Sequence, residues 1–312
     1  MIVVTCPGQG SQTPGFLDSW IAVPEYRTRL DELSELAKID LVAHGTTSDA
    51  DTIRDTAVAQ PLIVAASLLA WTALTNLTDT ASVGLAGHSV GEFAAAAAAG
   101  ILTDADALTL VRERGRLMAH AATLEKTGMS AVVGGVEEDV LAAITQAGLT
   151  PANMNGAGQI VAAGSLDALA SLAESAPRGA RVIPLQVAGA FHTAYMESAV
   201  AELQRIADSV TPASPTHTLW TNHDGSIVTE GSSFLNLLVS QVSSPVRWDL
   251  CMAGFQNAGI TGLIELTPAG ALTGIAKRGL RGIPTVAVKT PDDLETAVEL
   301  IASSSRGPSS EA

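Results

Sequence analysis

The residue most suited to chemistry is Ser89, which stands in the pattern Gly-x-Ser-x-Gly at residues 87–91. A short apolar run, residues 81–87, predicts a buried strand before it, and an alanine-rich run, residues 93–99, predicts a helix that ends at Gly100. A strand that turns sharply into a helix at this pattern is typical of a nucleophile elbow, which exposes the serine at its tip. Free N–H groups at the start of the helix favour negative charge on an attacked carbonyl. Ser89 is therefore a candidate nucleophile.

A serine nucleophile needs a base, and the chain has six histidines. The candidate is His192, because it follows the last predicted strand of a small domain, where the chain returns to the larger domain and a side chain can face the cleft. His88 adjoins Ser89, and we interpret it as structural, since neighbours at an elbow seldom face each other. No supporting context surrounds the other four, which are His44, His120, His217 and His223.

An arginine lies on the apolar face of a predicted helix over residues 104–122. Steps of about 100° per residue place Arg114 between Met118 and Ala121, inside the apolar stripe. A buried guanidinium needs a carboxylate, and two sources are open. Arg114 pairs with an acid elsewhere in the chain or binds a carboxylate of the substrate, unless its side chain extends far enough to keep the guanidinium in water.

A second glycine-rich loop, residues 6–12, follows the first predicted strand. It is not a dinucleotide-binding fingerprint, because Thr13 stands where the third glycine is required. Exposed N–H groups at the carboxyl end of a strand suit an oxyanion donor instead.

Strands and helices alternate along most of the chain, which predicts an α/β fold with a parallel sheet and helices on both faces. Between the N-terminal and C-terminal parts of this fold, the elements follow the order βαββαβ. This order predicts a ferredoxin-like insert at residues 124–192. The remaining residues, 1–123 and 193–305, form the core, and residues 306–312 are expected to be a frayed tail.

Composition narrows the function classes. The chain has 312 residues, of which 47% are hydrophobic and 16% charged, so it folds around a sizeable core. The net charge of -15 argues against nucleic acid and anionic membranes, and no apolar run approaches the ~20 residues of a membrane span. Two cysteines and no metal-type spacing indicate neither a disulfide framework nor a metal site. We expect a cytoplasmic monomer without a cofactor.

Six motifs in order resemble the malonyl-CoA:acyl carrier protein transacylase family over essentially the whole chain up to the tail. They are Pro7-Gly8-Gln9-Gly10-Ser11-Gln12, Gln60-Pro61, Gly87-His88-Ser89-Val90-Gly91-Glu92, Arg114-Gly115, Phe191-His192, and Gln241 through Pro245-Val246. The resemblance implies an α/β-hydrolase-like core with a ferredoxin-like insert, in agreement with the pattern of elements.

The resemblance also implies the site residues. Ser89 would be the nucleophile and His192 its base, oriented by the main-chain carbonyl of Gln241. Backbone N–H groups of Gln9 and Val90 would form the oxyanion hole. Arg114 would bind the malonyl carboxylate in a pocket lined by Gln60, Met118 and Phe191. The phenylalanine before the histidine, and Val90 after the serine, are similar to malonyl-selective relatives.

The implied activity is transfer of the malonyl group from malonyl-CoA to the phosphopantetheine thiol of an acyl carrier protein, for fatty acid synthesis, polyketide synthesis or both. A serine hydrolase is the alternative enzyme, although hydrolases usually place their histidine late in the chain, and here no histidine follows His223. A CoA-binding scaffold would leave Ser89 unexplained.

The acidic balance raises a question about the carrier protein, which is typically acidic as well. The densest cationic group includes Lys277 and Arg278, and the resemblance places both near the approach of the carrier. Arg178 and Arg181 of the insert could form a second side. The alternative is that Lys277 and Arg278 merely complement the C-terminal end of a helix.

Overall fold

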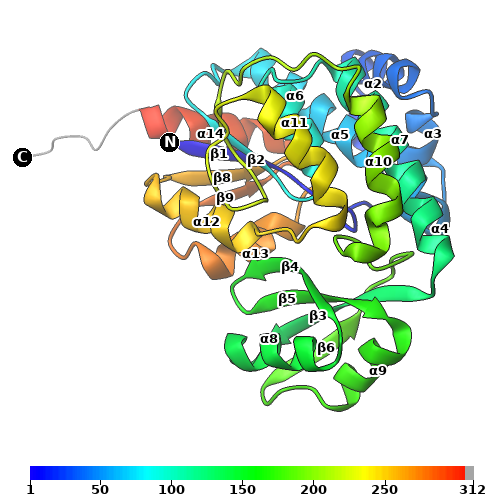
Figure 1. Ribbon diagram of the computed structural model, residues 1–312. Coiled ribbons are helices and arrows are strands. Elements are labelled where there is room, and N and C mark those ends of the chain that lie inside the picture. The colour runs from blue at the N-terminus through cyan, green and yellow to red at the C-terminus, as the bar shows by residue number, and fades with distance from the viewer. Residues whose placement is uncertain (306–312) are drawn as a thin grey trace, which may run out of the picture.

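The computed structural model describes residues 1–305, so the tail predicted at residues 306–312 lies outside the described residues. Two sheets organise the chain, and Figure 1 shows them in separate lobes, with the parallel sheet in the larger one. The predicted α/β fold with a parallel sheet is confirmed.

The parallel sheet has five strands in the order β7-β2-β1-β8-β9. Their bounds are β1 Ile2–Cys6, β2 Gly84–Gly87, β7 Thr218–Trp220, β8 Gly262–Glu265 and β9 Thr285–Ala287. β1 lies between β2 and β8, with Cys6 beside Gly87. Since parallel strands end at the same edge, this register brings the loop after β1 next to the turn after β2.

Alternate residues of β1 face opposite layers, as the pleat requires. Ile2 and Val4 pack in the larger cluster, which includes α5 (Thr56–Leu77), α6 (Gly91–Ala98) and α7 (Asp104–Leu124). Val3 packs in the second cluster with α12 (Trp248–Asn257) and α13 (Ala271–Gly279). Helices therefore cover both faces of the sheet, as predicted.

Helix α5 is the most apolar of the helices that cover the sheet. By length and composition it could cross a membrane, and among the described residues it alone passes that test. Gln60 with Pro61, Ser67 and Thr72 interrupt its apolar runs, which is why the sequence pattern did not suggest a span. In the fold, 78% of its apolar window is buried, so α5 is packed as a core helix.

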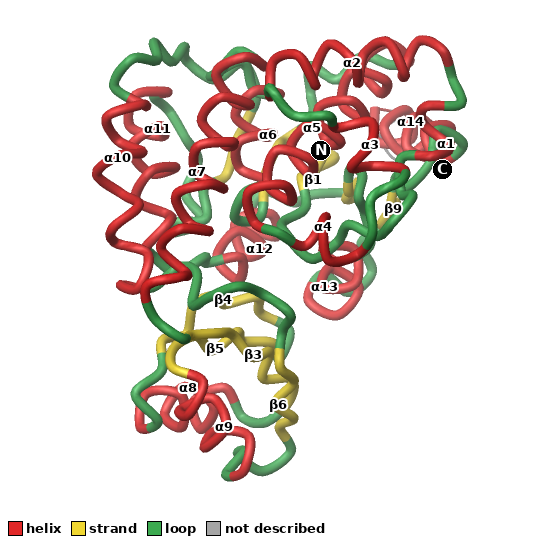
Figure 2. The backbone as a smooth tube through the Cα atoms, turned by 90° about the vertical axis from the view of Figure 1, so that its right-hand side faces the viewer, coloured by secondary structure: helices red, strands yellow, loops and turns green. Residues whose placement is uncertain are grey.

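The second sheet is antiparallel, in the order β4-β5-β3-β6. Its elements are β3 Thr127–Gly134, α8 Glu137–Gln146, β4 Thr150–Gly156, β5 Gln159–Ser165, α9 Leu166–Glu174 and β6 Ala180–Pro184. This is the predicted βαββαβ order. Figures 1 and 2 show α8 and α9 on the side of the sheet away from the core, and β4 contacts α12 and α13. The division at residues 124–192 stays a prediction.

The remaining helices join or cover these layers. They are α1 Asp18–Ile21, α2 Pro24–Ala37, α3 Leu41–Thr46, α4 Ala50–Arg54, α10 Glu197–Ala207, α11 Gly231–Ser240 and α14 Asp293–Ser305, with short 3-10 turns at Ala194–Met196 and Gln241–Ser243. The sequence pattern anticipated α2, α11, α12 and α14 but not α1, α3, α4 or α10.

Candidate active site

Ser89 stands in the turn between β2 and α6, with a left-handed backbone (φ 52°) that is unusual for a serine. The flanking glycines permit that turn. A Cβ on Gly87 would overlap the backbone of Gly91, and a Cβ on Gly91 would overlap the carbonyl oxygen of Cys6. The predicted strand, turn and helix are therefore present, and glycine at both positions is a steric requirement.

Asn222, beyond the end of β7, holds this turn from the neighbouring strand. Its Oδ1 accepts the N–H of Ser89 at 2.7 Å, and its Nδ2 donates to the carbonyl of Gly87 at 2.7 Å. The sequence analysis missed Asn222. The available signal was its position: a polar residue at the carboxyl end of a strand that neighbours β2.

His192 lies within hydrogen-bond distance of the serine, with Ser89 Oγ and His192 Nε2 2.7 Å apart. Its Nδ1 lies 2.8 Å from the main-chain carbonyl of Gln241. A carbonyl oxygen only accepts, so Nδ1 carries the proton and Nε2 is free to accept the serine proton. Burial, together with the charge of Arg114, lowers the pKa of His192 to about 3. The imidazole is therefore neutral, the form that a general base requires.

Arg114 is buried, 1% exposed, as its place on the apolar stripe of α7 predicted. Its Nη1 donates to Gln60 Oε1 at 2.7 Å and its Nη2 to Gln241 Oε1 at 2.9 Å. Nη2 also lies 3.5 Å from Ser89 Oγ. Burial lowers the pKa of Arg114 to about 9. Its hydrogen-bond partners within residues 1–305 are neutral amides and the serine, so a ligand carboxylate could bind the guanidinium without breaking a salt bridge in this part of the chain.

The loop after β1 packs closely against the elbow at Gly8. A Cβ on Gly8 would lie only 2.9 Å from His88 Nδ1 and 2.9 Å from the His88 carbonyl oxygen, so the close approach requires glycine. Gln9 follows, and its Nε2 donates to the carbonyl of Arg54 at 3.4 Å. Within residues 1–305, neither the N–H of Gln9 nor that of Val90 is engaged in a hydrogen bond. Gln9 and Val90 line one cleft with Ser89, so two such N–H groups suit an oxyanion.

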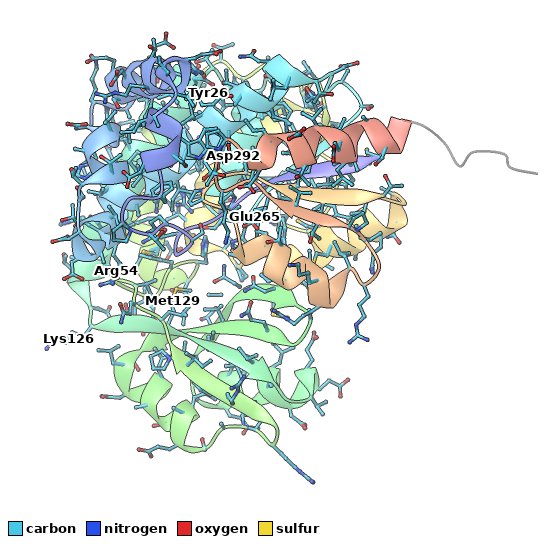
Figure 3. All side chains as sticks on the ribbon, turned by 180° about the vertical axis from the view of Figure 1, so that it is seen from behind. Tyr26, Arg54, Lys126, Met129, Glu265 and Asp292 are labelled. Atoms are coloured by element: carbon cyan, nitrogen blue, oxygen red, sulfur yellow. The ribbon has the colours of Figure 1, made fainter. Side chains whose placement is uncertain are left out.

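A cleft of about 560 Å³ opens over Ser89 and His192, between the parallel core and the antiparallel sheet. Of the predicted pocket residues, Gln60, Arg114, Met118 and Phe191 all line it, as do Gln9 and Val90. Gln241 sits behind it, in contact with Arg114. At the mouth α13 contributes Arg278, whereas Lys277 does not line the cleft. The insert contributes Met129, at the junction of the two lobes in Figure 3.

Among residues 1–305 there is no group of three or more histidine, cysteine or acidic side chains that could hold a metal ion. The groups around Ser89 are a hydroxyl, an imidazole, a guanidinium and amides. Their catalytic roles stay predictions. The arrangement suits acyl transfer through a serine ester to a nucleophile that enters by the cleft.

Comparison with known proteins places the chain. Residues 3–298 match the acyl transferase domain family. The malonyl CoA-acyl carrier protein transacylase of Mycobacterium tuberculosis is 50% identical over 302 residues, which cover 96% of this chain and 100% of that protein. The protein of the same name from Escherichia coli is 31% identical over 301 residues, covering 94% and 97%.

Solved structures agree. The crystal structure of MCAT from Mycobacterium tuberculosis has a TM-score of 0.92 at 50% identity, covering 96% of this chain and 99% of that one. A malonyl-transacylase in complex with a type II PKS acyl-carrier protein has a TM-score of 0.90 at 30% identity, covering 96% and 99%. The chain belongs to the acyl transferase family and, within it, to the malonyl CoA-acyl carrier protein transacylases.

Proposed function

We propose that this protein transfers the malonyl group from malonyl-CoA to the phosphopantetheine thiol of an acyl carrier protein, through a malonyl ester of Ser89. The observation that carries the proposal is the buried Arg114, whose guanidinium lies 3.5 Å from Ser89 Oγ and contacts no carboxylate of residues 1–305 directly. A malonyl group bound as a thioester carries the missing carboxylate two bonds from the carbonyl that the serine attacks.

In the first half-reaction, Ser89 Oγ attacks the thioester carbonyl while His192 Nε2 takes its proton. The N–H groups of Gln9 and Val90 stabilise the oxyanion. The C–S bond breaks, and the CoA sulfur takes the proton from His192. In the second, the carrier thiol gives its proton to His192 and attacks the ester, and Ser89 Oγ recovers the proton. One oxyanion hole serves both steps, so we expect ping-pong kinetics.

The hydrolase alternative uses the same elbow but does not explain why a guanidinium is buried at Arg114. The scaffold alternative predicts no covalent adduct at all. Intact mass spectrometry separates the three. Mixing with malonyl-CoA should add one malonyl group, and adding phosphopantetheinylated carrier protein should move it to the carrier. Loss of the group to water at the same rate without carrier would favour the hydrolase.

Arg114 should set the preference for a carboxylated acyl group. With acetyl-CoA the buried guanidinium stays without a carboxylate, which costs the acetyl group roughly 3–5 kcal/mol relative to malonyl. Arg114→Ala should therefore reduce the malonyl-to-acetyl ratio of kcat/KM sharply, and Arg114→Lys should restore it only in part, since an ammonium cannot replace a bidentate fork. Competition between the two thioesters measures the ratio. Arg116→Ala, on the exposed face of α7, is the control, and an unchanged ratio in Arg114→Ala would contradict the assignment.

The carrier should dock where α13 meets the cleft. Lys277 and Arg278 are exposed there, and Arg178 and Arg181 are exposed on the insert. Lys277→Glu with Arg278→Glu should raise the KM for the carrier more than tenfold, about 1.4 kcal/mol, and remove its dependence on salt. Acylation by malonyl-CoA should change far less. Arg27→Glu in α2 with Lys38→Glu at its C-terminal end makes the same charge change elsewhere. If both pairs behave alike, the carrier docks at another surface.

We further propose that the protein works as a cytoplasmic monomer and needs no cofactor, because malonyl-CoA is a substrate. It would supply malonyl groups to fatty acid or polyketide synthesis. The family membership supports malonyl transfer in either pathway.

A further inference from the structure

A buried carboxylate lies directly behind the nucleophile, and the mechanism above does not use it. Glu92, in the first turn of α6, is 1% exposed. Its Oε1 accepts the backbone N–H of Asn222 at 2.7 Å, and its Oε2 accepts a hydrogen bond from Gln241 Nε2. Removing a carboxylate from water is costly, so its placement calls for a specific purpose.

The side chain of Gln241 connects this carboxylate to Arg114. Its Oε1 accepts from Arg114 Nη2 at 2.9 Å, while its Nε2 donates to Glu92 and, at 3.2 Å, to the carbonyl of Ser89. A cation attracts the amide oxygen and a carboxylate attracts the amide NH₂. The two charges therefore fix one orientation of the amide, and a flipped amide would meet a like partner at both ends.

The main chain of the same residue holds the base. Its carbonyl oxygen lies 2.8 Å from His192 Nδ1, so the position of Gln241 sets the orientation of the imidazole. Glu92 also reaches the elbow, because Asn222, whose N–H it accepts, takes the N–H of Ser89 through its own side chain. One carboxylate thus has short connections to the nucleophile, the base and the guanidinium.

We infer that Glu92 is a positioning residue that holds Gln241 so that Arg114 presents its guanidinium to the acyl carboxylate and His192 keeps its orientation toward Ser89. The inference deepens the proposed function and rests on it. It assigns part of the selectivity for malonyl to a side chain that never touches the substrate.

Both oxygens of Glu92 accept N–H donors, which is the pattern of an ionised carboxylate. Burial raises the pKa of Glu92 to about 8, while the hydrogen bonds from Asn222 and Gln241 and the charge of Arg114 act in the opposite direction and favour the ionised form. The charge of Glu92 in turn raises the pKa of Arg114, against the effect of burial. Each charge therefore stabilises the other through the amide between them.

The test is Glu92→Gln, which keeps the size of the side chain and removes its charge. A glutamine that still accepts from Asn222 turns its NH₂ toward Gln241 Nε2, so the Gln241 amide is driven to flip away from Arg114. We expect the malonyl-to-acetyl ratio of kcat/KM to fall roughly tenfold. Acylation by both thioesters should also slow, because His192 loses its fixed partner. Glu113→Gln, on the outer side of α7, makes the same chemical change between Arg112 and Arg116 and should leave the ratio unchanged.

A double-mutant cycle identifies the route. Gln241→Met cuts the connection at its centre but keeps the main-chain carbonyl. If Glu92 acts through Gln241, Glu92→Gln should lower the ratio little further in the Gln241→Met background. Independent, additive effects would contradict the inference. So would a higher ratio in Glu92→Gln, because it would mean that the buried charge only repels the substrate carboxylate.

Folding is checked by thermal unfolding of each variant. If Glu92→Gln does not fold, Glu92→Asp replaces it in the cycle. It keeps the charge but is too short to reach Asn222 and Gln241 together, so the ratio should again fall, and an unchanged ratio overturns the inference. A parent protein that gains no malonyl mass would contradict the proposed function and this inference together. A malonylated parent with an unchanged ratio in the variants would contradict the inference alone.

Discussion

Ser89→Ala is expected to abolish the malonyl adduct and all transfer to the carrier protein. The expected loss is complete, because the proposed pathway runs through the serine ester and alanine offers no atom to carry it. Intact mass after mixing with malonyl-CoA measures the adduct, and a carrier assay measures transfer. The fold should tolerate the substitution, since Asn222 holds the turn through the main-chain N–H of residue 89, which alanine keeps.

Ser11→Ala is the matched control. Ser11 lies in the loop after β1, where its Oγ donates to the carbonyl of Gly8 at 2.8 Å, and it does not line the cleft. This variant should still gain one malonyl group. A malonyl mass on the Ser89→Ala protein would overturn the assignment of the nucleophile, whatever the control does.

The elbow shows how much local sequence determines. The glycines at 87 and 91 predicted a tight turn, and the structure gives the steric reason for each. Arg114 was found by helical steps alone, since one charge within an apolar stripe is visible in any helix of regular period. The insert followed from the order of its elements, because its strands pair within one continuous segment of the chain.

The types of the residues do not reveal groups that act through the main chain. The carbonyl of Gln241 is chemically the same as that of any other residue, so only the family resemblance pointed to it. Asn222 acts through its side chain, but it contacts Ser89 across 133 positions of sequence, so its position at a strand end becomes a signal only once the order of the strands is known. The sequence did contain a signal for Glu92 that the sequence analysis did not use. Glu92 is the one charged residue in the apolar α6, just as Arg114 is an isolated cation on the apolar face of α7.

Most of the helices that the pattern did not anticipate have a physical explanation too. α1, α3 and α4 have four to six residues each, too short for an apolar period to be recognised. α10 is longer, and its buried Ala199, Leu203 and Ala207 recur every fourth residue. The apolar residues of α10 gather on one face of the helix, so the sequence did carry a signal for it, which the sequence analysis missed.

His192→Ala is expected to slow acylation of Ser89 by roughly 10² to 10⁴, the usual contribution of a positioned general base. The hydroxyl would keep its place and its oxyanion donors but lose the acceptor that lies 2.7 Å from it. Single-turnover mixing with malonyl-CoA, followed by intact mass, measures the rate. The parent rate should also lack an inflection at about pH 6.5, the ordinary pKa of histidine. The sign follows from the lowered pKa, about 3: His192 stays neutral as the pH falls through that range, so the base is not lost to protonation.

His88→Ala tests whether this loss belongs to His192 rather than to any imidazole in the cleft. His88 also lines the cleft, but its Nε2 lies 2.9 Å from Asn155 Oδ1 on β4, so its hydrogen bond is with the insert rather than with Ser89. His88→Ala should slow the acylation of Ser89 less than His192→Ala does. The comparison holds when the two variants have equal thermal stability. An equal loss in the two variants would transfer the role of base to His88, and a near-normal rate in His192→Ala would leave Ser89 to be activated by another group. The geometry argues against both outcomes, because His192 Nδ1 already has its acceptor in the Gln241 carbonyl, which leaves Nε2 directed at the serine hydroxyl.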